Sequence, residues 1–337
     1  NFVHFLLFNS FFPKVSLGPI MRYQEFIGQL NNVRGKMAIP EDCIKGVNRI
    51  LLGLFKKLVL ADRLSAITTP FYDSPITISG ANAWVAVLLF LLQLYFDFSG
   101  YMDLAMGSAH LFGFKLKENF NLPLRSISIS DFWRRWHISL VDWLTIYIYY
   151  PINFHFRRYK QKATVLAIVV TFFLSGLWHG WGFTFICYAL LHALYILIEV
   201  TFKRNPGSAI RFLPGRWNRA LNYTTVFLLV ALSLIFFRSP SIDKAVHIFQ
   251  YLFNFTHFIN PDVSWSSWLI NGGANIEVTF NNRLSIVLSM LFILYERTIN
   301  KTANTSRFNF KYLFIFIAAI VLFGAFGSTQ RFIYLQF

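Results

Sequence analysis

Long apolar runs recur along the whole chain and constrain its fold more than any other feature of the sequence. They fall at about residues 1–12, 48–62, 82–114, 163–178, 180–200, 221–238, 283–296 and 312–327. With 55% hydrophobic and only 14% charged residues, the chain is too apolar for an ordinary soluble domain of 337 residues. Because lipid leaves every backbone amide to be satisfied within its own segment, helices are the default. The pattern predicts an all-α, multi-pass membrane protein with a single domain over residues 1–337.

Two of the apolar runs carry charged residues inside them. Lys56 and Lys57 lie in the middle of 48–62, so an amphipathic helix at the membrane interface is the alternative to a spanning helix there. In the run at 82–114, Asp97 and Asp103 flank Ser99-Gly100. Non-helical backbone at membrane depth must be buried in protein or line a wet cavity, so we expect an interior helix that is broken at this point. The two aspartates are expected to cap the break or to pair with buried arginine rather than to act as catalytic acids.

The charge balance is strongly basic, with 31 Lys+Arg against 15 Asp+Glu. The basic residues lie in short loops between apolar runs and not on a soluble face, which argues against a nucleic-acid partner. Three basic loops, at 157–162, 203–219 and 297–311, contrast with residues 239–282, where Lys244 is the only cation. The positive-inside rule places the three basic loops in the cytoplasm and the long loop outside.

This orientation makes 163–200 a helical hairpin with both ends inside and His179 at its turn. The first arm, 163–178, gives only about 24 Å of helix at 1.5 Å per residue, which is less than the roughly 30 Å hydrocarbon core. We therefore expect His179 to lie within the membrane or in a protein-lined cavity. Gly176, Gly180 and Gly182 allow a sharp turn or a close helix contact beside it.

The stretch SISISDFWRRWHISLVDWL, residues 126–144, is the second polar cluster. Ser128 and Asp131 have the Ser-x-x-Asp spacing that starts a helix. The helical period then predicts one amphipathic interfacial helix, on which Trp136, His137 and Leu140 share a face with Trp133. His137 would point inward with the tryptophans.

The two histidines are the candidates for chemistry. Histidine takes up and releases protons near neutral pH, and an ionisable residue inside a membrane is a functional candidate because its desolvation costs free energy. We expect the neutral imidazole of His179 to take the proton of a bound alcohol as its oxygen attacks an activated acyl carbon. His137 would orient the acceptor, donate a hydrogen bond to the developing oxyanion, or hold His179 in position. The structural alternative is that each histidine is only hydrogen-bonded within its local turn.

Other polar residues favour structural roles. His110 and His192 are expected to be structural, and Arg134 and Arg135 to meet lipid headgroups. No set of His, Asp and Glu has the spacing of metal ligands, and neither a G-x-S-x-G elbow nor a phosphate loop occurs. The two cysteines, Cys43 and Cys187, lie far apart in apolar or helical contexts, so neither a disulfide nor a zinc site is indicated.

Several stretches, in the same order over essentially the whole chain, resemble the membrane-bound O-acyltransferase (MBOAT) superfamily. The resemblance is to its bacterial branch, typified by the membrane subunit of alginate O-acetyltransferase. The matching stretches are FFPKVSLGPIMRYQEF (11–26), GLFKKLVLADRL (53–64), YFDFSGYMDLAMGSAHLFGF (95–114), NFNLPLRSISISDFWRRWHISL (119–140), LSGLWHGWGFTFICYALLH (174–192), IFFRSPSIDKAV (235–246) and RFIYLQF (331–337). As a set these motifs are specific, whereas any one alone would be weak.

The resemblance implies a polytopic helical fold with broken or re-entrant helices around a central funnel or tunnel. It assigns the catalytic role to His179, in the LWHG motif, and makes His137, in RRWHIS, the second signature position. It also implies a multi-pass protein of the bacterial inner membrane with no permanently bound cofactor, whose acyl donor is a cytoplasmic thioester such as acetyl-CoA. Relatives in this branch pass acetyl groups toward exported polysaccharide, often with an SGNH-type extracytoplasmic partner that completes the transfer.

The sequence departs from the family pattern in two places. Where the branch usually reads WLRDYIYIPLGG, this chain has WLTIYIYYPINF, so Thr145 and Ile146 replace an Arg-Asp pair. The change removes a charged pair near the site and leaves both histidines in place. The chain also opens near the family's FFP…GPI motif, so several N-terminal helices of the family are expected to be missing from it.

The leading hypothesis is an O-acyltransferase that acetylates a hydroxyl of an exported polysaccharide or of a partner protein, in contact with membrane lipid. A rival hypothesis is a non-enzymatic glycan or lipid transporter, or flippase, in which His179 relays protons. An MBOAT that transfers D-alanine or acylates protein is the third. Acyl transfer by membranes that contain the chain discriminates the enzyme hypotheses from the transporter.

Overall fold

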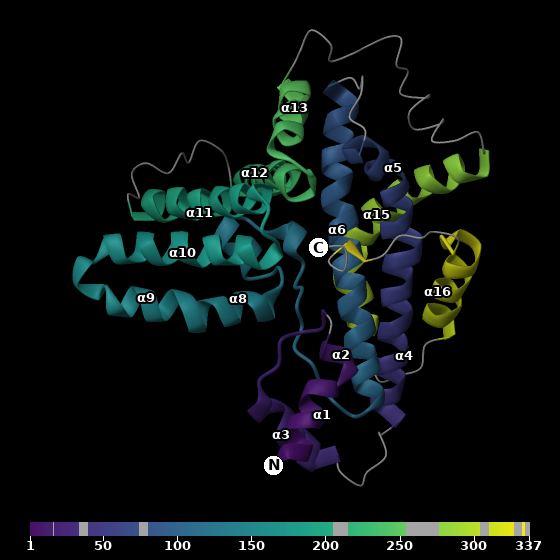
Figure 1. Cartoon of the computed structure of the whole chain (residues 1–337). Coiled ribbons are helices and arrows are strands. Elements are labelled where there is room, and N and C mark those ends of the chain that lie inside the picture. Colours follow the sequence, from purple (N-terminus) through teal and green to yellow (C-terminus); the bar gives the residue numbers. More distant parts are fainter. Residues whose placement is uncertain are drawn as a thin grey trace. The chain divides into compact units, whose positions relative to one another are not determined.

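The computed structural model describes residues 1–15, 17–33, 40–73, 80–204, 215–253, 276–303, 310–326 and 332–333 (Figure 1). The described part is helical and contains no strand beyond one isolated β-bridge between Phe120 and Trp136. Within these described ranges, four helices are long and apolar enough to cross a membrane, at Gly80–Leu111, Gln161–His179, Phe183–Phe202 and Asn218–Arg238. The prediction of an all-α, multi-pass membrane protein is confirmed.

The chain folds into two compact units. Unit 1 comprises Asn1–Ile67, Leu92–Asn119 and Leu269–Gln336, and unit 2 comprises Thr68–Leu91 and Phe120–Trp268. The described helices of unit 1 are α1 (Phe2–Ser10), α2 (Phe12–Val15), α3 (Tyr23–Val33), α4 (Pro40–Leu54), the π-helix η1 (Phe55–Ala61), α15 (Ile276–Ala303) and α16 (Phe310–Phe323). Two helices contribute to both units, α5 (Asp62–Asp73) and α6 (Gly80–Leu111).

Unit 2 carries the second set of helices. These are the 3₁₀ turn η2 (Pro123–Arg125), α7 (Ile129–Trp133), α8 (Ile138–Leu144), the π-helix η3 (Thr145–Tyr149), α9 (Tyr150–His155), the 3₁₀ turn η4 (Arg157–Tyr159), α10 (Gln161–His179), α11 (Phe183–Arg204), α12 (Gly215–Arg238) and α13 (Ile242–Phe253). Figure 1 shows α10 beside α11, with the arm formed by α8 and α9 along the other side of α10.

Within unit 1, α4 and its continuation pack against α6 through paired glycines. A Cβ atom on Gly53 would lie 2.6 Å from the carbonyl oxygen of Gly100, and one on Gly46 would lie 2.8 Å from that of Gly107. Such distances require hydrogen in place of a side chain, which lets two apolar helices approach closely.

The expected break in α6 does not occur. The helix runs without interruption through Ser99-Gly100, and Gly100 serves the close contact with Gly53 instead. The prediction is wrong because the missing side chain of Gly100 allows the backbone of Gly53 to approach and does not serve a turn.

Buried ion pairs connect the same two helices. Asp103 accepts hydrogen bonds from Arg49 at 2.6 Å and from Lys56 at 2.7 Å, and Lys57 lies 2.7 Å from Asp97. Asp62 pairs with Lys57, and Glu118 with Arg49. The segment at 48–62 is therefore a largely buried element of unit 1, in which Lys56 and Lys57 face carboxylates and not an exposed polar surface. The expectation of a buried arginine partner is confirmed for Asp103, whereas Asp97 pairs with Lys57.

We predict that Gly53→Ala destabilises the protein by about 1–3 kcal/mol, the usual cost of overpacking. The new methyl group would meet backbone, which cannot rotate away. Gly28→Ala is the matched control, since a Cβ there meets nothing within 4 Å and alanine is the better helix former. Denaturant unfolding of the detergent-solubilised protein measures both. Equal stability of the two variants would contradict the tight packing.

We also predict that Asp103→Asn lowers the free energy of unfolding by about 3–5 kcal/mol, because Lys56 keeps its buried charge without its partner. Glu25→Gln removes a carboxylate from the exposed pair with Lys117 and should cost about 0–1 kcal/mol. The same unfolding experiment compares them. A loss for Asp103→Asn as small as that for Glu25→Gln would show that the buried pair is not needed.

Candidate active site

A helical arm and α10 run antiparallel and have nearly the same length. The arm consists of α8, η3 and α9, with 7, 5 and 6 residues, and α10 has 19. Contacts of α9 and η3 with α10 hold the two together (Figure 1). The basic turn at 156–160 joins them at one end, so the residues at their other ends are brought to the same level. Those residues are His137, which precedes α8, and His179, which ends α10.

The helix expected over 128–144 is broken at His137. Its start is as predicted, since the Ser128 hydroxyl accepts a hydrogen bond from the Asp131 amide at 3.1 Å. However, α7 ends at Trp133, and the Arg135 carbonyl accepts a hydrogen bond from the Asn121 amide at 2.9 Å. His137 then adopts a left-handed backbone conformation, with φ 46°, and caps the next helix. One continuous helix is therefore wrong, because a distant strand-like contact takes up the backbone group.

The two histidines converge on one tryptophan. The ring centroid of Trp178 is 6.1 Å from that of His137 and 4.8 Å from that of His179. Both imidazoles are buried, with exposed fractions of 4% and 8%. Burial is the main cause that lowers the pKa of His137 to about 3, and charge repulsion from the neighbouring His179 contributes to this shift. His137 is therefore neutral at physiological pH.

Aromatic rings surround His179. Besides Trp178, these include Phe237 from α12, at 5.2 Å between centroids, and Tyr188 from α11, at 6.3 Å. The helix ends here because Gly180 has a φ of 156°, and a Cβ atom on it would lie 2.7 Å from the ring of Phe185. The predicted hairpin with His179 at its turn is confirmed, although α10 begins earlier than expected, at Gln161.

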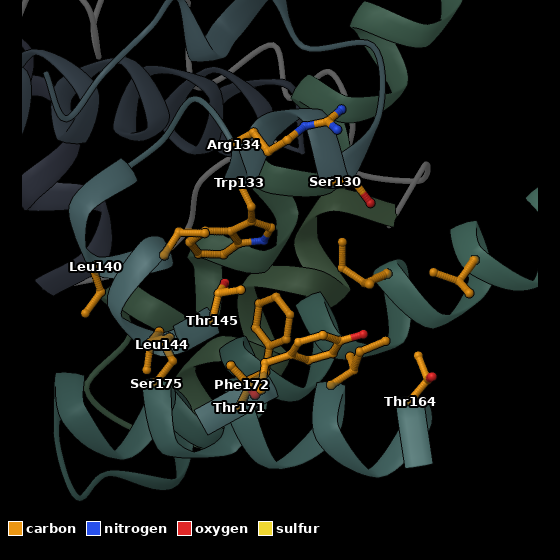
Figure 2. Close-up of a pocket in the computed structure, with 15 residues that line it drawn as sticks. Ser130, Trp133, Arg134, Leu140, Leu144, Thr145, Thr164, Thr171, Phe172 and Ser175 are labelled. Atoms are coloured by element: carbon orange, nitrogen blue, oxygen red, sulfur yellow. The ribbon is translucent and has the colours of Figure 1, made fainter. Parts of the chain in front are cut away.

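An apolar pocket of about 290 Å³, here called the α10 pocket, lies between the arm, α7, α10 and α11 (Figure 2). Its residues on α10 are Thr164, Ile168, Thr171, Phe172 and Ser175, and those on the arm include Leu140, Val141, Leu144 and Thr145. His179 follows Ser175 by four residues and His137 precedes Leu140 by three. One end of the pocket is thus about one helical turn from both histidines.

The walls of the α10 pocket offer little hydrogen bonding. The Thr171 hydroxyl donates to the Ala167 carbonyl of its own helix at 2.6 Å, and the Ser130 amide donates to Glu199 at 2.9 Å. Thr145, which stands where the family pattern has a charged residue, is part of this wall. Arg134 is the charged residue of the lining and lies 3.7 Å from Asp131. The rest of the lining is apolar or carries hydroxyl groups, so the pocket suits a largely apolar, extended group.

The remaining sequence candidates lie elsewhere or have structural contacts. His110 is in the last turn of α6, and Asp97 and Asp103 belong to the ion pairs of unit 1. Among the residues that the structure describes, no three His, Cys, Asp or Glu side chains form a metal-binding group, and both cysteines are free.

Sequence reasoning missed the surroundings of the pair. Trp178 and Tyr188 carry no pattern that marks them, and Phe237 and Ser233 come from α12, far along the chain. The one available signal was spacing, because Tyr188 and His192 are four residues apart and share a face of α11.

Comparison with known proteins adds to this geometry. Residues 1–207, which contain both histidines, match the model of the membrane-bound O-acyltransferase family. The chain belongs to this family. It is 33% identical over 250 residues to the peptidoglycan O-acetyltransferase of Helicobacter pylori, a match that covers 74% of this chain and 46% of that protein. It is 34% identical to the probable alginate O-acetylase AlgI of Pseudomonas aeruginosa, over 76% of this chain and 46% of that protein.

A second group of MBOAT relatives is named for another acyl group. The teichoic acid D-alanyltransferase of Bacillus subtilis is 31% identical, over 69% of this chain and 60% of that protein. The chain spans about half the length of the O-acetyltransferase relatives that it matches.

We predict a pH dependence of stability that belongs to His137. Its pKa is about 3 when folded against an ordinary 6.5, so the unfolded chain binds more protons between these values. Stability is therefore complete above pH 6.5 and falls as the pH drops toward 3, by about 1.4 kcal/mol per unit from this one group. His137→Asn, which tolerates the left-handed backbone, should remove that part of the slope. Parallel slopes for the parent and His137→Asn would contradict the burial of His137.

Proposed function

We propose that this MBOAT chain carries the active site of a membrane O-acyltransferase, with His179 as the general base. The proposal rests on one observation above all: His137 and His179 converge on Trp178 about one helical turn from the end of the α10 pocket. This arrangement supplies two buried imidazoles where an acyl group held in the pocket would end. The names of the relatives support the reaction class.

In the proposed reaction the acceptor hydroxyl gives its proton to the imidazole of His179 as its oxygen attacks the carbonyl carbon of a thioester. The new C–O bond forms, the C–S bond breaks, and the leaving sulfur takes the proton back from His179. Negative charge develops on the carbonyl oxygen in the transition state. The neutral His137 would donate a hydrogen bond to this oxygen.

The donor is proposed to be acetyl-CoA, which would enter through the α10 pocket from the cytoplasmic side. The basic turn, with Arg157, Arg158 and Lys160, leads directly into α10, whose second residue is Lys162. The sequence contains no Asp or Glu between Asp142 and Glu199. This uncompensated charge would attract the phosphates of coenzyme A. The largely apolar pocket would then receive the pantetheine arm and the acyl group.

The acceptor is proposed to be a hydroxyl of an exported polysaccharide, or of an SGNH-type partner that completes the transfer, at the bacterial inner membrane. The names of the O-acetyltransferase relatives support an extracytoplasmic glycan. The D-alanyltransferase relative favours a second candidate, the transfer of D-alanine from a carrier protein. Both candidates use the same base and the same pocket.

We predict that His179→Ala lowers acyl transfer by about 10²–10⁴-fold, the usual contribution of a general base. His137→Ala should lose about 10²-fold, as expected for one oxyanion donor. The exposed His155→Ala should keep the parent rate. The measurement is transfer of label from acetyl-CoA, and in parallel from a D-alanyl carrier protein, by membranes that contain the chain.

Undiminished transfer by His179→Ala would remove this residue from the mechanism. Transfer from the D-alanyl carrier alone would replace the proposed donor. Export of an unmodified glycan without any transfer would favour a transporter over an acyltransferase.

A further inference from the structure

His192 is a fully buried histidine that the proposed chemistry does not use. It lies on α11 with an exposed fraction of 0%, one helical turn from Tyr188. Rings pack around it from two other helices, with Trp133 from α7 at 5.0 Å and Phe172 from α10 at 6.3 Å, and from its own helix, with Tyr188 at 4.8 Å. A polar ring in such a place has to satisfy both of its nitrogens within the protein.

The hydrogen bonds of His192 define its protonation state. Nε1 of Trp133 lies 3.2 Å from Nδ1 of His192, and indole has only a donor, so Nδ1 must be the acceptor. The ring proton is therefore on Nε2, which donates to the Ser233 hydroxyl oxygen at 2.9 Å. The Ser233 hydroxyl in turn donates to the Val230 carbonyl at 2.7 Å. Each hydrogen bond from Trp133 through His192 and Ser233 to Val230 therefore has a defined donor and a defined acceptor.

The two ends of this chain differ in what they can do. Ser233 is anchored on backbone of α12, whereas the indole of Trp133 forms part of the wall of the α10 pocket and packs on Phe172, another wall residue (Figure 2). On its other side, His192 contacts Tyr188, which contacts His179. His192 thus lies between Trp133, in the wall of the pocket, and Tyr188, whose ring contacts the proposed base His179.

We propose that His192 is a positioning residue that holds the Trp133 indole as a fixed wall of the α10 pocket, through the hydrogen-bonded chain from Trp133 to His192 to Ser233. The inference rests on the proposed function for its effect on catalysis. The fixed wall would set how the acyl group in the pocket is aligned with His179. A side chain that only filled this space would not need a hydrogen-bonding partner at each of two ring nitrogens, as His192 has.

The test is a double-mutant cycle on Trp133 and His192, with two readouts. His192→Phe keeps a ring but removes the acceptor, and Trp133→Phe keeps an aromatic wall but removes the donor. For acyl transfer, each single variant should lower kcat/KM for the donor by about two- to tenfold, the range expected for one hydrogen bond. The double variant should have a kcat/KM for the donor no lower than that of the less active single variant. KM for the acceptor should stay at the parent value. Ser233→Ala removes the far end of the hydrogen-bonded chain. Its matched control is Ser289→Ala, which removes another buried serine that donates to a carbonyl of its own helix.

The second readout does not need activity. In a background with Cys43 and Cys187 changed to alanine, Thr171→Cys places a thiol in the wall of the pocket, and Val165→Cys places one on an exposed face of α10. His192→Phe and Trp133→Phe should change the rate of thiol labelling at position 171 by the same factor, without further change in the double variant. Labelling at position 165 should stay constant.

The outcomes separate this inference from the proposed function. Additive effects of the two variants on labelling, or folded His192→Phe protein with parent kcat/KM and parent labelling, would overturn the positioning role and leave the general base untouched. Coupled labelling together with full activity of His179→Ala would support the fixed wall and overturn the proposed function. Partial rescue by His192→Asn, which offers an oxygen acceptor near the place of Nδ1, would support the hydrogen bond over mere packing.

Discussion

A polar group between apolar helices has to find its partner inside the protein, and this constraint governs both units. Lipid offers no hydrogen-bonding partner, and an unpaired charge or hydrogen-bonding group that is buried costs several kcal/mol. In unit 1, Asp103 lies between Arg49 and Lys56, so that each buried charge faces an opposite one. In unit 2, the same requirement produces the chain from Trp133 through His192 to Ser233. Polar side chains in this fold therefore mark where helices are joined.

The site follows from a simple geometric relation within unit 2. Two antiparallel helical runs of nearly equal length start from the same basic turn, so their far ends meet. His137 and His179 are those ends. The backbone adds what length alone would not: a left-handed residue at His137 and a positive φ at Gly180. Each histidine therefore sits where a helix begins or ends, with its ring directed toward Trp178 and not along a continuous helix face.

The sequence predicts the features that depend on local pattern. The apolar runs, the hairpin around His179 and the helix start at Ser128 were all visible, because periodicity, glycine and capping residues act over a few positions. The failures have a common cause in partners that are distant in sequence. A helix break was predicted at Gly100 because the sequence does not show that Gly53 packs against it. The helix through His137 was read as continuous because the contact with Asn121 could not be foreseen.

The replacement of an Arg-Asp pair by Thr145 and Ile146 gains a physical meaning from the position of Thr145 in the wall of the α10 pocket. Arg134 of α7 already lines this wall and lies 3.7 Å from Asp131. A second arginine there would place a further charge beside the donor, and the pocket would attract phosphate more strongly. With threonine there, the arm holds no lysine or arginine, and the cations of α10 and of the basic turn lie at residues 157–162. Along α10, charge and apolar surface are thus separated. In the proposed reaction this separation fixes the direction of the donor, because its phosphates are held at the turn while its uncharged end extends toward His179.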